Sequence, residues 1–310
     1  MRRYLPSVVR YSEPLGEVVV ADNASDDDSL RVLATEFASV RVDELDRNYG
    51  FAEGYNRAIA QVATPYVLLL NSDVEVTPGY LEPLYEYMER HADVAAVQPK
   101  LLAEWRRTHF EYAGAAGGYL DRLGYPFCRG RIFDNVEQDE GQYDTVADVH
   151  WTTGAAMLVR THIYNKVGGL DGRFFAHMEE IDLCWRMRNQ GYRLCCVPQS
   201  TVYHVGGGTL PQGSPHKTYL NFRKNLLMIH NNHPQAAKVQ ACRWWLDALA
   251  SMVFLLKGRL GEFCAVWRAW CAFGSTRRDF AQMPGPAPLA GSILWAYYIK
   301  RRRTWKQLCI

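Results

Sequence analysis

Short apolar runs alternate with helix-like stretches through the first 100 residues, and this alternation constrains the fold most. The strand-like runs are Glu17–Asp22, Val40–Leu45, Tyr66–Leu70 and Val94–Gln98. The helix-like stretches between them are Ser25–Leu33, Gly54–Val62 and Pro78–His91. Strands that alternate with helices predict an α/β fold with a mostly parallel sheet and helices on both faces.

The rest of the chain divides by pattern. Residues 104–147 are aromatic, Gly-rich and without clear period, which predicts a long insertion or a loop with short strands. A helix is predicted at Glu179–Gln190, an extended run at Leu194–Val205 and a flexible loop at Gly206–Pro215. Beyond residue 216 the spacing of apolar residues is helical. We therefore predict an α/β domain at residues 1–215 and a helical extension at 216–310.

Composition excludes several classes of protein. The chain has 310 residues, a net charge of +2, 48% apolar and 22% charged residues, which is an ordinary globular balance. Without a basic excess, nucleic-acid binding by bulk charge is not expected. The eight cysteines form no C-x-x-C pair and no signal peptide is visible, so reduced thiols in the cytoplasm are predicted. The sequence contains no run of about 20 apolar residues, so a bilayer-spanning helix is not expected.

Polar side chains follow three of the predicted strands. Asp22 and Asn23 end the first strand, Asn71 and Asp73 follow the third, and His204 ends the last. Ligands of open parallel sheets bind beyond the carboxyl ends of the strands. Carboxylates with an imidazole suit Mg²⁺ or Mn²⁺ held jointly with substrate phosphates. Taken alone, Asp73 fits a turn or helix cap equally well, and His204 fits a hydrogen-bonded structural histidine better than a metal ligand.

A second acidic cluster, made of Glu179, Glu180 and Asp182, opens the predicted helix after Phe174. Acids in the first turn of a helix complement its dipole. A carboxylate there can also act as a general base toward a hydroxyl nucleophile. Position alone does not choose between the two roles.

Six segments, in this order, carry a resemblance to a known family: VVVADNAS (Val18–Ser25), NYGFAEGYN (Asn48–Asn56), LLLNSDVEV (Leu68–Val76), TGAAMLVR (Thr153–Arg160), GGLDGRFFAHMEEIDLCWR (Gly168–Arg186) and VYHVGGG. The ordered set resembles the inverting family 2 glycosyltransferases, in particular the bacterial branch with rhamnosyl- and galactofuranosyltransferases. The resemblance spans roughly residues 4–230. It implies the GT-A fold and transfer of a sugar from a UDP-, dTDP- or GDP-sugar to a glycan or lipid-linked acceptor in cell-surface polysaccharide synthesis.

The resemblance also implies roles for particular residues. Asp22 corresponds to the family's contact with the nucleotide, and Asp73 to its metal-binding Asp. His204 corresponds to a histidine that binds the metal in galactofuranosyltransferase relatives. The general base corresponds to Glu180, with Glu179 and Asp182 as candidates for acceptor binding or helix support. Further candidates for donor binding lie within the same motifs: Asn23, Asn48, Asn56 and Asn71.

The sequence departs from the family at its start. Family members begin with an apolar strand, whereas this chain begins inside the helix-like stretch Arg3–Val9. We therefore expect an unfilled position in the sheet beside the nucleotide pocket, with two explanations: the true start lies upstream, or this form is impaired. That expectation supports a first rival, a catalytically impaired protein that binds sugar nucleotides or glycans. A nucleotidyltransferase is a second rival, but no Gly-rich phosphate loop with Lys or Arg is visible. A membrane-surface scaffold, the third, leaves the acidic motifs unexplained.

The C-terminal segment is basic and aromatic. Trp295, Tyr297 and Tyr298 precede a run of Lys and Arg, and the last 30 residues contain no Asp or Glu. Such a tail fits a membrane surface with anionic lipid. It equally fits a helical cap whose aromatic side chains pack on the core. We predict peripheral contact of the C-terminal helices with the inner face of the plasma membrane.

Overall fold

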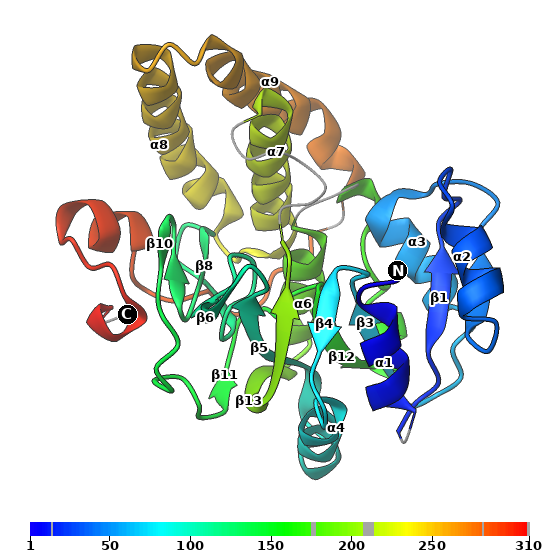
Figure 1. The fold of residues 1–310 in the computed structure, drawn as a ribbon. Coiled ribbons are helices and arrows are strands. Elements are labelled where there is room, and N and C mark those ends of the chain that lie inside the picture. The colour runs from blue at the N-terminus through cyan, green and yellow to red at the C-terminus, as the bar shows by residue number, and fades with distance from the viewer. Residues whose placement is uncertain (14, 175–177, 207–213, 281, 309–310) are drawn as a thin grey trace.

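The computed structural model describes all residues except 14, 175–177, 207–213, 281 and 309–310. Its main element is a seven-stranded sheet with the order β11-β13-β5-β12-β3, to which β4 adds on β13 and β6 on β5 (Figure 1). The strands are β3 (Tyr66–Leu70), β4 (Val74–Val76), β5 (Val94–Ala103), β6 (Arg106–Phe110), β11 (Ala147–Asp148), β12 (Ala156–Arg160) and β13 (Arg193–His204).

The sheet is mixed, which corrects the prediction of a mostly parallel sheet. Only β5 and β13 pair in parallel, and the other described pairs of this sheet are antiparallel. The reason is β12, which enters between β3 and β5 and runs against both. Because β3, β5 and β13 still run in one direction, the chain segments that follow β3 and β13 meet at the same edge.

A parallel two-stranded ribbon of β1 (Val19–Asp22) and β2 (Arg41–Glu44) stands apart from this sheet. In the described part of the chain, β1 pairs only with β2, and β3 pairs only with β12. A cavity lies between the free edges of β1 and β3 and is lined by residues of both strands. The ribbon and the main sheet are thus separated by the cavity at this point.

Six helices surround these sheets (Figure 1). They are α1 (Leu5–Ser12), α2 (Ser29–Glu36), α3 (Gly50–Ile59), α4 (Leu81–Arg90), α5 (Thr161–Lys166) and α6 (Glu179–Asn189). Helix α1 packs on β4, where the Ser12 hydroxyl lies 2.8 Å from that of Tyr80. α4 packs on β5 and β13 and buries Leu84 and Met88 completely.

Three longer helices follow: α7 (Pro215–Asn232), α8 (Ala236–Leu256) and α9 (Leu260–Thr276). α7 begins with Ser214, whose side chain accepts a hydrogen bond from the Lys217 amide, and with Pro at its first position. It packs on α6 and α9, and its residues Leu226–Ile229 are fully buried. The helical part therefore shares its core with the sheet.

The segment at 104–147 contributes a small antiparallel sheet of β7 (Gly118–Leu120), β8 (Pro126–Cys128), β9 (Arg131–Ile132) and β10 (Asn135–Val136). The C-terminal segment packs on it. The rings of Trp305 and Tyr119 lie 4.2 Å apart, and those of Tyr297 and Phe133 lie 4.9 Å apart. These aromatic side chains of the tail thus cap the core.

Candidate active site

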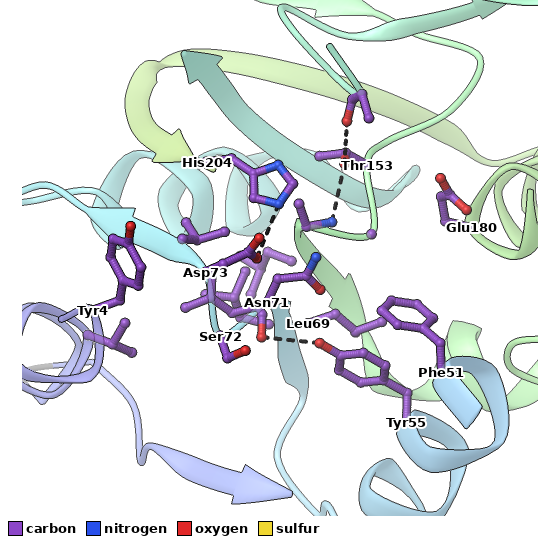
Figure 2. A pocket seen from close by; sticks show the side chains of 18 of the residues that line it. Tyr4, Phe51, Tyr55, Leu69, Asn71, Ser72, Asp73, Thr153, Glu180 and His204 are labelled. Carbon is purple, nitrogen blue, oxygen red and sulfur yellow. Dashed lines mark hydrogen bonds and ion pairs between the residues drawn. The ribbon is translucent and has the colours of Figure 1, made fainter. Parts of the chain in front are cut away.

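One cavity of about 2310 Å³ opens at the edge where β3 and β13 end, and it continues to the end of β1 (Figure 2). It exceeds the few hundred to about 1,000 Å³ typical of small-molecule sites, because it includes the gap between β1 and β3. The predicted residues that line it are Asp22, Asn23, Asn71, Asp73, Glu179, Glu180 and His204.

Asp73 and His204 are brought together by strand pairing. Asp73 lies in the turn between β3 and β4, and β4 pairs with the end of β13 so that His204 is opposite Val74. The Val205 amide also donates to the Asp73 carbonyl oxygen at 3.2 Å. As a result, His204 Nε2 lies 3.2 Å from Asp73 Oδ1. The side chain of His204 is 8% exposed and that of Asp73 is 36% exposed, so the carboxylate is open to the cavity.

Glu111 is a site residue that the sequence analysis missed. It follows β6, is buried, and places Oε1 3.4 Å from His204 Nδ1. Its other oxygen accepts from the Ala113 amide at 2.5 Å. Gly206 makes room for it, because a Cβ there would lie 2.7 Å from Glu111 Oε1. Nothing in the local pattern marks Glu111; the only signal is an acid before a Gly-rich run.

The carboxylates of Asp73 and Glu111 favour the protonated imidazole of His204 when no metal is bound. Burial lowers the pKa of His204, but Asp73 and Glu111 outweigh burial and raise it to about 9. Burial also raises the pKa of Asp73, whereas its contact with His204 lowers it more, and the net shift is downward. The two groups therefore form an ion pair.

The side chains around His204 can be compared with the ligands that Mg²⁺ or Mn²⁺ prefers. Across the described residues, no three His, Cys, Asp or Glu side chains form a ready-made metal cage. Such ions are usually bound by one or two protein carboxylates together with substrate phosphates. Asp73 and His204 fit this pattern, since one carboxylate oxygen faces the cavity. Glu111 faces the far ring nitrogen, as carboxylates beside metal-binding histidines do.

On the N-terminal side, Asp22 is buried at the end of β1 and accepts from the Ser25 amide at 3.0 Å. Asn23 is held by its neighbours: it donates to the Gly50 carbonyl at 3.0 Å and accepts from the Tyr49 amide at 2.9 Å. Asn48 accepts from Asn23 and from the Gly50 amide. Asn48 does not line the cavity, so its observed contacts are those of a loop-fixing residue.

Asn56 and Asn71 differ in position. Asn56 lies outside the cavity, donates to the Leu170 carbonyl at 2.6 Å and accepts from the Tyr164 hydroxyl at 2.6 Å. It therefore ties α3 to the turn at Gly169–Leu170. Asn71 lines the cavity directly after β3, beside the Leu70 carbonyl that accepts from the Tyr55 hydroxyl (Figure 2).

Helix α6 carries the acidic cluster. Met178 precedes it with φ of 72°, a left-handed conformation, and Glu180 faces the cavity beside Gly154. Figure 2 shows Glu180 on a different wall from Asp73 and His204. Burial raises the pKa of Glu180, while the charge of Lys224 lowers it less. A carboxylate with a raised pKa is suited to accept a proton near neutral pH.

Asp182 lies elsewhere. It is fully buried and outside the cavity, where it pairs with Arg186 at 2.8 Å and accepts from Asn232 at 2.7 Å. These contacts match the helix-support alternative. Glu179 is also buried but lines the cavity.

Lys217, Arg223 and Lys224 follow the predicted loop at Gly206–Pro215, and they suit either phosphate binding or a solvated helix face. Lys217 lines the cavity, together with Asn221. Lys224 is fully buried outside it and donates to the Phe174 carbonyl. Burial lowers the pKa of Lys224 to about 8, against the opposing effect of Glu179. Arg223 does not line the cavity. The loop at Gly206–Pro215 that was expected to close over a diphosphate lies mostly outside the described residues.

Comparison with solved structures defines the class as a GT-A glycosyltransferase fold. The crystal structure of GalNAc-T7 with UDP, GalNAc and Mn²⁺ aligns with a TM-score of 0.58 and 15% identity, over 76% of this chain and 46% of that one. Staphylococcus aureus TarS aligns with a TM-score of 0.50 and 16% identity, over 79% and 40%. This chain thus spans less than half the length of either structure, and the likeness concerns the fold.

Sequence comparison then shows which family of enzymes this chain resembles. The glycosyl transferase family 2 model matches residues 1–139. N-acetylglucosaminyl-diphospho-decaprenol L-rhamnosyltransferase of Mycobacterium tuberculosis H37Rv is 27% identical over 220 residues, 66% of this chain and 71% of the relative. Rhamnosyltransferase WbbL of Escherichia coli K12 is 29% identical over 163 residues, 50% of this chain and 61% of the relative. The chain is therefore similar to family 2 glycosyltransferases, in agreement with the resemblance carried by the sequence motifs, and the family model covers residues 1–139.

Proposed function

We propose that this protein transfers a sugar from a nucleoside-diphosphate donor to a hydroxyl group of a glycan or lipid-linked acceptor, with inversion at the anomeric carbon. The observation that carries the proposal is one cavity with two chemically distinct walls. The Asp73–His204 pair lies on one wall and Glu180 on another. A site for a metal-bound diphosphate and a base across the same cavity are what a single displacement requires.

The donor diphosphate is assigned to the wall with Asp73. Asp73 and His204 would hold Mg²⁺ or Mn²⁺, and Glu111 would orient the imidazole. When bound, the ion neutralises charge that develops on the leaving diphosphate. Asp22 lies at the far end of the same cavity, where it is suited to a hydroxyl or ring nitrogen of the nucleoside.

Glu180 is assigned as the general base. Its carboxylate accepts the proton of the acceptor hydroxyl as that oxygen forms a bond to the anomeric carbon and the bond to the diphosphate breaks. The pKa raised by burial supports this role. The charge of Lys224 lowers the pKa of Glu180 against the larger effect of burial, and Asp182 supports the helix that presents Glu180.

The relatives suggest the substrates. Two of them are named rhamnosyltransferases, and one name specifies a lipid diphosphate acceptor. We therefore propose dTDP-rhamnose as the first donor to test and a lipid-linked sugar as the acceptor class, with UDP- and GDP-sugars as alternatives. This activity belongs to bacterial cell-surface polysaccharide assembly, at the inner face of the plasma membrane.

A second candidate is a protein that binds sugar nucleotides without turnover. The open position between β1 and β3 favours it, because the end of β1 carries Asp22 and has strand support on one side only. Turnover, not binding, separates the two candidates.

Isothermal titration of UDP, GDP and dTDP with and without Mn²⁺ tests the donor site. The proposal predicts tight binding of one nucleotide only with the ion. Transfer from the matching nucleotide sugar is then followed by NMR, where the anomeric coupling of the product reports inversion. Binding with no transfer to any acceptor supports the second candidate. No binding of any nucleotide contradicts both.

A further inference from the structure

Helix α8 exposes apolar side chains and buries polar ones, the reverse of an ordinary surface helix. One stripe along it, which we call the outer face, consists of Trp245, Leu249, Met252, Val253 and Leu256. These side chains are 42–83% exposed, with Trp245 at 72% and Leu256 at 83%. Their spacing of three and four residues places them on one side of the helix. A contiguous exposed apolar stripe of this kind marks an interaction site.

The polar residues of α8 are turned toward the protein instead. Arg243 and Asp247 are buried and form an ion pair with 3.3 Å between Nε and Oδ1. Arg243 also donates to the Leu123 carbonyl, and Trp270 donates to Asp247 at 3.1 Å. This network anchors α8 to the folded body. By length and composition α8 could cross a membrane, but crossing would pull this buried ion pair away from its partners.

The charge around the outer face has one sign. The acids within α8 and α9 are Asp247 and Glu262, and both are buried and paired with arginines. The exposed charges on the two helices and their turn are cations, including Lys238, Lys257 and Arg268. Cations beside exposed Trp and Leu are complementary to a bilayer with anionic headgroups.

The turn between α8 and α9 also reaches the cavity through α7. Gly261 packs on Pro215, since a Cβ at Gly261 would lie 2.7 Å from the proline ring. Lys217 and Asn221, two and six residues after Pro215 on α7, line the cavity. In Figure 1 the three helices extend from the end of the molecule opposite α4. The apolar face and one rim of the cavity are therefore linked by a short, packed segment.

We propose that the outer face of α8 lies in the interface of an anionic lipid bilayer and holds the α7 rim of the cavity at the membrane surface. An acceptor anchored in the lipid then reaches Glu180 without leaving the bilayer. The acceptor part rests on the proposed function, whereas the lipid contact does not. This assignment moves the membrane contact from the basic tail, whose Trp305 and Tyr297 pack on the core, to α8.

The test compares two matched double variants of the full chain. Trp245→Ser with Leu256→Ser removes the most exposed residues of the outer face. Trp295→Ser with Ile299→Ser removes a Trp and an aliphatic residue of the tail, which are 57% and 59% exposed. Co-sedimentation uses vesicles of phosphatidylcholine with about one third phosphatidylglycerol. The outer-face variant is expected to lose about tenfold or more in vesicle partitioning, and the tail variant to lose little.

Activity separates the two parts of the proposal. With a water-soluble acceptor lacking the lipid, the outer-face variant is expected to keep wild-type turnover. With a lipid-linked acceptor in vesicles it is expected to lose turnover in proportion to partitioning. Absence of transfer with both acceptors alongside intact vesicle binding overturns the proposed function but not the lipid contact.

Three results overturn the lipid contact. The first is wild-type protein that does not partition into anionic vesicles. The second is loss of partitioning in the tail variant but not in the outer-face variant. The third is a wild-type dimer in light scattering that the outer-face variant converts to monomer, without vesicle binding by either form; that result assigns the face to a second copy of the chain.

Discussion

β1 of the ribbon and β5 of the main sheet both begin with a run of apolar residues, yet the two strands are supported very differently. β5 is buried along its whole length and has strand neighbours on both edges. β1 has one described neighbour, and Val19 and Ala21 are exposed. The comparison teaches that burial of a strand depends on its neighbours more than on its composition. It also divides the site, because Glu180, Asp73 and His204 lie on the well-supported body and Asp22 on the ribbon.

The largest expected effect tests whether proton transfer depends on Glu180, beside the main sheet, and not on the β1–β2 ribbon. We expect Glu180→Gln to lower kcat by about 10²–10⁴-fold while nucleotide affinity is kept, because the amide matches the carboxylate in shape but does not accept the proton. Initial rates and titration of the nucleotide measure the two quantities. Asp22→Asn on the ribbon is the control and should weaken nucleotide binding with little change of kcat at saturating donor. Near-normal turnover of Glu180→Gln would show that the base is another residue.

Hydrogen exchange tests directly whether the amides of β1 are less protected than those of β5. Amides of Val19–Ala21 should exchange at least about 100-fold faster than those of Val94–Val97, because regions with few buried contacts open without global unfolding. Exchange followed by NMR or mass spectrometry measures both segments in one sample. Nucleotide with Mn²⁺ should slow exchange in the ribbon more than in β5. Equal protection of β1 and β5 in the free protein would remove the distinction.

Substitution of Glu111 tests whether this residue supports Asp73 and His204, the pair proposed to bind the metal. We expect Glu111→Gln to weaken Mn²⁺-dependent nucleotide binding by about 10–100-fold, because the carboxylate that orients His204 is lost. Glu104→Gln is the matched control, since Glu104 lies on the same hairpin but pairs with Arg3 and Arg107. Isothermal titration measures both variants. Similar affinities in the two variants would remove Glu111 from the site.

The smallest effect concerns the charge of Lys224, which acts on Glu180, the proposed base. Lys224 lowers the pKa of Glu180, against the larger upward effect of burial. Turnover requires the carboxylate, so kcat should fall as pH falls through this raised pKa. In Lys224→Met the pKa rises further, and the acid limb of the kcat profile should move to higher pH by about 1 pH unit or less. Lys238→Met on α8 serves as the control. A limb that stays in place would show that Lys224 does not act on the base.

The sequence predicted most of the local structure because periodicity is a local property. Tyr66–Leu70 is a strand exactly where the apolar run stands, and Glu179–Asn189 is a helix beginning at the predicted acid. The direction of β12 was not predictable, since strand pairing joins residues as far apart as Leu70 and Ala156. The mixed sheet follows from that pairing.

The site was predicted in part for the same reason. Asp22, Asp73 and His204 could be located because each follows a recognisable strand. Glu111 could not, because only the fold brings it to His204 across 93 positions of sequence. Asn56 was a candidate on its motif alone, and the structure gives it contacts with Leu170 and Tyr164. Whether a side chain faces a cavity or a neighbouring loop depends on tertiary packing.

The facing edges of β1 and β3 have a consequence for handling the protein. Unpaired strand edges are templates for pairing between chains, and β3 is the apolar run YVLLL without a charged residue. Soluble protein should therefore be lost in a concentration-dependent manner that accelerates on warming. Nucleotide with metal, which we propose binds in the cavity beside these edges, should extend the lifetime of the sample. Purification with and without nucleotide and metal tests this expectation.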